Sequence, residues 1–267
     1  RKQVGGLINA EPGEVYFTSG GTEADNLAIL GVAGRFQSGH IITSSIENAA
    51  VLGCCHYLEE QGFDITFLPQ DAEGIVSAAQ VAQALRPDTL LVSLMLANNE
   101  IGSIQPVAEV GRLLAEHGVL LHTDAVQAVG KLPIDVQQLG VDMLTISGHK
   151  INGPKGIGAL YLRHGVDLQP LLFGGGQERR LRSGTENMPG IVGLGVAAEI
   201  TAKRWPQQAR QAAAVRDCFW HELQQLISGV VVNGGWRQRL PGNLNLSFQD
   251  VEGAALELML TPEMPAG

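Results

Sequence analysis

Apolar runs and amphipathic segments alternate along about the first 200 residues, and this alternation constrains the fold more than any other feature. The runs predict strands, and the segments between them predict helices that end near glycines such as Gly62 and Gly118. The run 89–96 is almost entirely apolar, as expected for a strand that is covered on both faces of its sheet. Such alternation predicts βαβ units, and hence an α/β fold with a mostly parallel sheet flanked by helices.

The predicted elements can be placed along the chain by residue range. The predicted strands are 15–18, 41–43, 65–68, 89–96, 119–123, 143–146, 158–162 and, after a change of pattern near residue 190, 242–248. The predicted helices are 23–32, 47–61, 77–85, 107–117, 191–205, 208–227 and 251–260, with a break at Pro206. We therefore expect a large domain over residues 1–204 and part of a smaller C-terminal α+β domain over residues 205–267.

Composition argues against several classes of function. The 267-residue chain has a formal net charge of −9, whereas nucleic-acid binding usually needs a basic face. No apolar run reaches the roughly 18 residues of a membrane span, and we see no signal peptide, so we expect a cytoplasmic protein with neither nucleic acid nor membrane as partner. Cys54, Cys55 and Cys218 form no disulfide framework and no spaced metal pair. We expect Cys54 and Cys55 in the core, Cys218 in the core or half-buried, and no metal site.

Polar residues and glycines follow four of the predicted strands at the point where each strand ends. In chain order they are Gly20, Gly21 and Thr22; Asn98 and Asn99; Asp124 and Gln127; and Ser147, His149 and Lys150. Ligands of open α/β sheets bind outside the carboxyl ends of the strands. We therefore expect these four groups to meet in one site.

The chemistry of these groups suits pyridoxal 5'-phosphate (PLP). A lysine can form a Schiff base with an aldehyde cofactor, and Lys150 lies just past a strand end. The Asp124 carboxylate could pair with a protonated pyridine nitrogen. Free N–H groups at the start of the helix after Gly21, with the Thr22 hydroxyl, suit a phosphate.

Each motif also has a plain structural interpretation. The glycines could form a turn with a threonine cap, and Asn98 and Asn99 could shape a turn. The loop 174–185 could use its arginines (Arg179, Arg180 and Arg182) and Thr185 to meet an anion, or it could be a basic surface loop. The chain has no GxxxxGK[ST] motif and no GxGxxG motif after the first strand, which argues against a nucleoside triphosphate site and a dehydrogenase.

Five motifs together resemble the bacterial cysteine desulfurases of the NifS/IscS type, which are class V, fold-type I PLP-dependent enzymes. They are FTSGGTEADNLA at 17–28, NNEIG at 98–102, HTDAVQ at 122–127, SGHK at 147–150 and RSGT at 182–185. Their order and spacing match over nearly the whole chain. The resemblance implies the large domain of a PLP-dependent transferase.

The resemblance also implies a role for each site position. Lys150 would carry PLP covalently and move the substrate's α-proton, Asp124 would keep the pyridine nitrogen protonated, and Gln127 would bond the ring 3'-oxygen. The other implied contacts are Asn99 beside the ring; Gly21, Thr22, Ser147 and His149 on the 5'-phosphate; and Thr185 on the phosphate of the second subunit of a homodimer. The implied reaction converts L-cysteine to L-alanine. Sulfur passes as a persulfide to an acceptor such as an iron–sulfur scaffold, or to thio-modification.

Two departures from the family pattern keep other functions open. Asn48 stands at the ring-facing position where the family usually has histidine, and an amide neither stacks like an aromatic ring nor acts as an acid–base group near neutral pH. We expect the family's persulfide cysteine beyond residue 267, in a protein of which this chain is a fragment lacking both ends. The alternatives are a class V aminotransferase or lyase, which needs no such cysteine, and an inactive, truncated PLP-binding scaffold.

Overall fold

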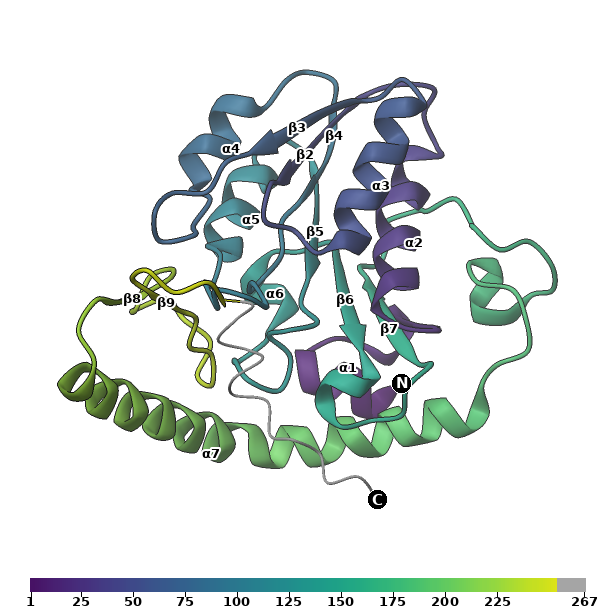
Figure 1. The fold of residues 1–267 in the computed structure, drawn as a ribbon. Coiled ribbons are helices and arrows are strands. Elements are labelled where there is room, and N and C mark those ends of the chain that lie inside the picture. The colour runs from purple at the N-terminus through teal and green to yellow at the C-terminus, as the bar shows by residue number, and fades with distance from the viewer. Residues whose placement is uncertain (254–267) are drawn as a thin grey trace.

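A seven-stranded sheet forms the centre of the computed structural model, which describes residues 1–253 (Figure 1). Its strands are β1 (Val15–Thr18), β2 (His40–Ser44), β3 (Asp64–Leu68), β4 (Thr89–Ser93), β5 (Leu120–Asp124), β6 (Met143–Ser147) and β7 (Gly158–Leu162). The strand order is β1-β7-β6-β5-β4-β2-β3. All neighbours pair in parallel except β7, which is antiparallel to both β6 and β1. The predicted mostly parallel sheet is confirmed.

Helices cover both faces of this sheet. They are α1 (Lys2–Ile8), α2 (Gly21–Ala33), α3 (Ala49–Glu60), α4 (Ala78–Ala84), α5 (Val107–Ala115), α6 (Val136–Leu139) and α7 (Met188–Leu226), with short 3-10 turns η1 (Pro12–Glu14), η2 (Gly148–Ile151) and η3 (Gln177–Arg180). Successive strand residues point to opposite faces: Ile41 packs with α2 and α3, whereas Ile42 packs with α1 and α5. Burial on both faces explains why the strands are so apolar.

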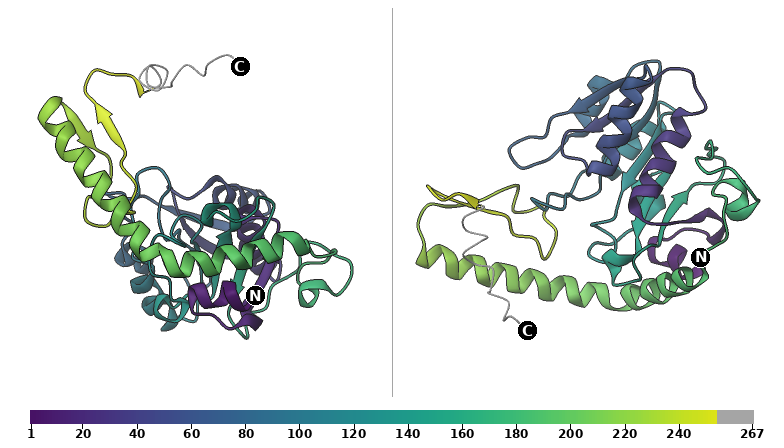
Figure 2. Two further views of the ribbon diagram at one scale, coloured as in Figure 1. Left: turned by 90° about the horizontal axis from the view of Figure 1, so that it is seen from below. Right: turned by 45° about the vertical axis from the view of Figure 1, so that its right-hand side comes forward.

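The predicted break at Pro206 is wrong, because α7 runs unbroken from Met188 to Leu226 with Pro206 inside it. A proline removes one helical hydrogen bond and crowds the preceding turn, which can bend a helix without ending it. Figure 2 shows the two halves of α7 at an angle to one another. The helix passes uninterrupted through the expected domain boundary at 204/205, and that boundary stays a prediction.

The C-terminal part of the described chain adds a separate two-stranded antiparallel sheet. It consists of β8 (Val230–Val232) and β9 (Leu246–Phe248), which lie near the C-terminal half of α7 (Figure 1). The strand predicted at 242–248 is present but covers only Leu246–Phe248, and β8 was not predicted from the sequence. Most of the predicted helix 251–260 lies outside the described residues. Within residues 1–253, no helix is both long and apolar enough to cross a bilayer.

Candidate functional site

The ends of the parallel strands bring the predicted site residues to one edge of the sheet. Thr18, the last residue of β1, and Ser147, the last residue of β6, both pair with Gly158 on the intervening β7. Asp124, which ends β5, pairs with Thr145 on β6. The loops that carry Gly21, Gln127 and Lys150 therefore leave the sheet side by side, as the strand pattern predicted.

The N-terminus of α2 packs directly on this edge. The helix begins at Gly21, and its N-cap, Gly20, supplies no side-chain hydrogen bond to the first N–H groups. A Cβ atom on Gly21 would lie 3.0 Å from Cγ2 of Val126 and 3.5 Å from Cβ of Ser147. Glycine is thus the residue that allows α2 to approach the loops after β5 and β6 so closely.

A hollow of about 340 Å³ lies in front of this helix end, and Gly21, Thr22, Ser147 and His149 are among its lining residues. The Ser147 hydroxyl and Nδ1 of His149 are hydrogen-bonded at 2.9 Å. Unused backbone N–H groups and a positive helix end favour an anion at such a place. The four residues expected at the phosphate are therefore gathered around one hollow.

Asp124 is buried, with 6% of its surface exposed, and its Oδ1 accepts a hydrogen bond from the backbone N–H of Val126 at 2.8 Å. Burial raises the pKa of Asp124 to about 6, so the carboxyl is mostly ionised at neutral pH. No lysine or arginine of residues 1–253 forms a salt bridge with it. A buried carboxylate in this state suits a cationic ring nitrogen.

A buried polar network around His122, two residues before Asp124 on β5, was not predicted from the sequence. His122 bonds to the Ser93 hydroxyl at 2.9 Å through Nδ1 and to the Thr145 hydroxyl at 3.1 Å through Nε2. Burial lowers the pKa of His122 to about 3, so the imidazole is neutral. Asp25 of α2 lies with Oδ1 3.6 Å from Nε2 of His122, and its pKa is raised by burial and by the charge of Asp124. The sequence gives little sign of this network, because Asp25 lies near the start of α2 beside other polar residues.

Glu47 is a third buried acid at this edge, after Asp124 and Asp25. Its Oε1 accepts hydrogen bonds from the Ser44 hydroxyl at 2.7 Å and from the backbone N–H of Met95 at 2.8 Å. Burial raises the pKa of Glu47 to about 8, so this carboxyl is largely protonated near neutral pH. Its role is to tie the ends of β2 and β4 together.

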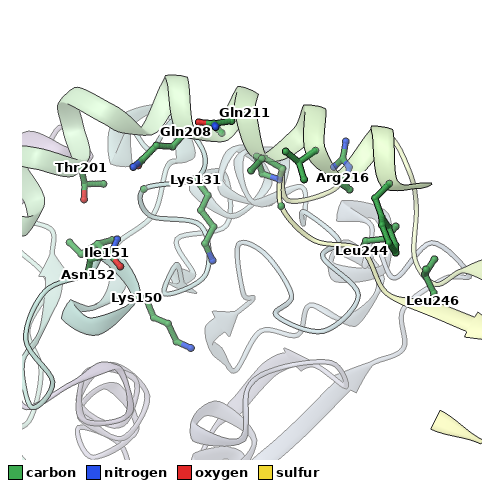
Figure 3. Close-up of a pocket in the computed structure, with 17 residues that line it drawn as sticks. Lys131, Lys150, Ile151, Asn152, Thr201, Gln208, Gln211, Arg216, Leu244 and Leu246 are labelled. Carbon is green, nitrogen blue, oxygen red and sulfur yellow. The ribbon is translucent and has the colours of Figure 1, made fainter. Parts of the chain in front are cut away.

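Lys150 lies in η2 and lines a pocket of about 790 Å³ between η2, α7 and the segment before β9. Lys131, in the loop after β5, lines the same pocket, and Figure 3 shows both lysine side chains reaching into it. Nζ of Lys131 donates a hydrogen bond to Oε1 of Gln127 at 2.9 Å. Sequence reasoning missed Lys131, because no strand or glycine motif marks its position.

The three predicted asparagines have different settings. Asn98 is buried and shapes its turn, since its Oδ1 accepts from the N–H groups of Glu100 and Ile101 and its Nδ2 donates to the carbonyl of Ile46. Asn99 is exposed and free to face a ligand. Asn48 is exposed at the start of α3, where its side chain caps the helix.

The loop that contains Thr185 lies next to the N-terminus of α2, but Thr185 does not line the hollow formed by Gly21, Thr22, Ser147 and His149. Thr185 is exposed and lines a separate hollow of about 180 Å³. Arg182 pairs with Glu23 at 2.7 Å, and Arg179 donates to the carbonyl of Val15 and stacks over the ring of Tyr16. Both arginines thus have partners within the chain.

The cysteines do not line the site. Cys54 and Cys55 are buried in α3, as predicted, and burial raises both thiol pKa values to about 12. The prediction that Cys218 is core or half-buried is wrong, because it lies exposed on the second half of α7. That half of the helix extends past the main sheet (Figure 1).

Comparisons with known proteins agree with this architecture. The model of the family described as aminotransferase class-V matches residues 1–264. Cysteine desulfurase IscS of Methanosarcina thermophila is 50% identical over 262 residues, which is 97% of this chain and 65% of that protein. The chain therefore spans about 65% of the length of that relative.

Solved structures of similar proteins share the fold of this chain. A NifS-like protein superposes with a TM-score of 0.93 at 40% identity, covering 97% of this chain and 72% of that one. A structure described as SspA in complex with cysteine superposes with a TM-score of 0.84 at 42% identity, covering 93% and 70% of the two chains.

Proposed function

Since this chain belongs to the aminotransferase class-V family, we propose that it is part of a PLP-dependent cysteine desulfurase. The observation that carries the proposal is the meeting of three features at one sheet edge: the amine of Lys150, the buried carboxylate of Asp124 and the open N-terminus of α2 at Gly21. When bound, PLP supplies an electron sink that stabilises negative charge on the α-carbon of an amino acid.

The residues of the chain divide the work of binding. The amine of Lys150 would hold the cofactor aldehyde and would carry a proton at the substrate α-carbon. Asp124 would keep the ring nitrogen protonated, and Gln127 and Asn99 would orient the ring. The N–H groups at the start of α2, with Thr22, Ser147 and His149, would bind the phosphate.

The donor set of the structure fits the cofactor. A PLP phosphate carries two negative charges, and the hollow before α2 offers N–H and hydroxyl donors together with the imidazole of His149. The pKa of Asp124, about 6, falls when a cationic partner lies against the carboxylate. Binding of a pyridinium at this place would relieve the cost of burying an unpaired charge.

In the reaction we propose, L-cysteine and a thiol give L-alanine and a persulfide. The Cβ–S bond of cysteine breaks, a new S–S bond forms with the attacking thiolate, and the carbon skeleton takes up a proton. Buried Cys54 and Cys55 cannot supply that thiolate, because their pKa values lie near 12. The exposed Cys218 does not line the pocket of Lys150.

We also propose that the enzyme works as a homodimer and passes its sulfur to an acceptor protein such as an iron–sulfur scaffold. Thr185 is exposed in a loop beside the phosphate hollow, where a second subunit could approach it. Its hydroxyl would then bind the phosphate held by the partner.

A product assay tests the proposed reaction. The protein is incubated with PLP, L-cysteine and an excess of a small thiol, and alanine and pyruvate are quantified. A desulfurase gives alanine, and Lys150→Ala gives none. Asn48, which cannot serve as an acid–base group, keeps a cysteine lyase as the second candidate. Pyruvate and ammonia in place of alanine would show that the lyase is correct.

A further inference from the structure

Lys131 and Gln127 form a rigid pair beside Lys150. The loop after β5 coils on itself, with the N–H of Ala128 bonded to the carbonyl of Ala125 and the N–H of Lys131 bonded to the carbonyl of Ala128, both at 2.9 Å. This places the two side chains four residues apart on a helix-like turn. Nζ of Lys131 then donates to Oε1 of Gln127 at 2.9 Å.

The backbone under Lys131 is held in place by α7. Gly130 has a φ of +79°, a conformation that suits glycine, and a Cβ atom there would lie 2.8 Å from Cγ2 of Thr201 and 3.2 Å from Cγ2 of Ile151. Only glycine allows the loop to pass so close to α7 and η2. Packing thus fixes the backbone from which Lys131 projects, and the hydrogen bond to Gln127 orients its side chain.

The hydrogen bond decides which way the Gln127 amide faces. An ammonium group has three donors and no acceptor, so it can meet only the oxygen of an amide. With Oε1 turned toward Lys131, the NH₂ group of Gln127 is left to donate elsewhere. Without Lys131, the Gln127 amide could rotate at little cost, so that Oε1 rather than the NH₂ group faces the other way.

We propose that Lys131 is a positioning residue that holds the Gln127 amide with its NH₂ group toward the 3'-oxygen of the bound cofactor. The inference rests on the proposed function, since it assigns a donor to the ring oxygen of PLP. A lone lysine on a flexible loop would serve a general electrostatic role, whereas this one has a defined partner at hydrogen-bond distance.

The electrostatic setting of Lys131 supports this role. Burial lowers its pKa, and the charge of Lys150 lowers it further. Two amines that line one pocket repel each other while both are charged, and the hydrogen bond to Oε1 of Gln127 stabilises the charged form of Lys131 against this repulsion.

A double-mutant cycle with a spectroscopic readout tests the proposal. The visible absorbance band of the lysine-bound cofactor is titrated with pH in four proteins: wild type, Lys131→Met, Gln127→Leu and the double variant. A donor to the ring oxygen stabilises the form that has lost its proton, so losing the donor raises the pH midpoint. We expect Lys131→Met to raise it by about one pH unit and Lys131→Arg to restore most of the shift. In the Gln127→Leu protein, Lys131→Met should add almost nothing.

Two results would overturn the inference. An equal shift from Lys131→Met with and without Gln127 would mean that Lys131 acts through its charge alone, and no shift in either background would mean that it does not act on the cofactor. Lys203→Met, an exposed lysine on α7 that pairs with Glu199, is the matched control and should leave the midpoint unchanged. A wild-type protein without any visible band would refute the proposed function itself, which keeps the two failures distinct.

Discussion

Asn48 caps helix α3 by accepting a hydrogen bond from the backbone N–H of Ala50 at 3.0 Å. The residue that departs from the family's histidine thus has a structural task of its own. Loss of an asparagine cap costs about 1 kcal/mol of stability. Asn48→Ala should lower the free energy of unfolding in urea by about that amount, while Asn48→Asp should keep it. Equal stabilities of Asn48→Ala and the wild type would show that the cap contributes nothing.

The same position allows a test of reactivity. Asn48→His adds a group that can accept and donate a proton near neutral pH, and a positioned acid–base group contributes a hundredfold or more to many reactions. Because the new imidazole is not supported by its neighbours, we expect a smaller gain, about tenfold, in alanine formation from L-cysteine. Asn48→Gln is the size control and should show no gain. No increase with histidine would mean that this position does not face the reacting atoms.

Lys150 should be the single site of covalent attachment. Treatment with PLP followed by borohydride should fix a stable adduct on the wild-type protein and on Lys203→Ala, and peptide mapping should place it at Lys150. Lys150→Ala should lose the adduct. Because Lys131 lines the same pocket, the mapping must separate the two lysines. An adduct that persists on Lys131 in the variant would contradict the assignment.

Gly21→Ala should weaken PLP binding without abolishing it. The new Cβ would lie 3.0 Å from Cγ2 of Val126, so α2 or the loop after Asp124 has to shift by a few tenths of an ångström. Overpacking of this kind costs about 1–3 kcal/mol, which corresponds to a rise in Kd of roughly fivefold to more than a hundredfold. Fluorescence titration with PLP measures it. Gly53→Ala, where a Cβ meets no atom within 4 Å, is the control. Unchanged affinity in Gly21→Ala would show that this approach is not needed.

The sheet and most of the site could be predicted from sequence because both follow local rules. Strands covered on both faces are continuous apolar runs, and the polar residues just beyond them, such as Asp124 and Lys150, fall at one edge through the parallel topology alone. The bend at Pro206 was mistaken for a helix end because a local rule cannot weigh the packing that holds α7 together. Lys131 was missed for a similar reason, since its importance arises from a neighbour, Gln127, and not from a motif.

The buried acids were harder still to predict. Asp25 and Glu47 look like ordinary polar residues at helix starts until the fold encloses them. Their raised pKa values come from burial, a property of the tertiary structure. Sequence reasoning can note an acid among apolar neighbours, but it cannot say which acid keeps its proton.

Glu47 should make stability fall as pH rises. Its pKa is about 8 in the folded protein against an ordinary 4.5, so between these values the folded state binds a proton that the unfolded state has lost. The free energy of unfolding therefore decreases with rising pH across this window. His122 has the opposite effect at lower pH. Its pKa is about 3 in the folded protein against an ordinary 6.5, so between these values the unfolded state binds a proton that the folded state lacks, and the free energy of unfolding increases with rising pH.

Glu47→Gln isolates the first effect. The amide oxygen can still accept from the Ser44 hydroxyl and the Met95 N–H, while the titration is removed. Oε2 of Glu47 has no hydrogen-bond partner within residues 1–253, so the NH₂ group that replaces it carries a penalty that is the same at every pH. Measured by urea unfolding of the cofactor-free protein, the free energy of unfolding of the variant should rise relative to that of the wild type by roughly 3 kcal/mol between pH 5 and pH 8. The contribution of His122 is common to both proteins and cancels. A stability difference that does not change with pH would show that Glu47 is ionised in the folded protein throughout this range.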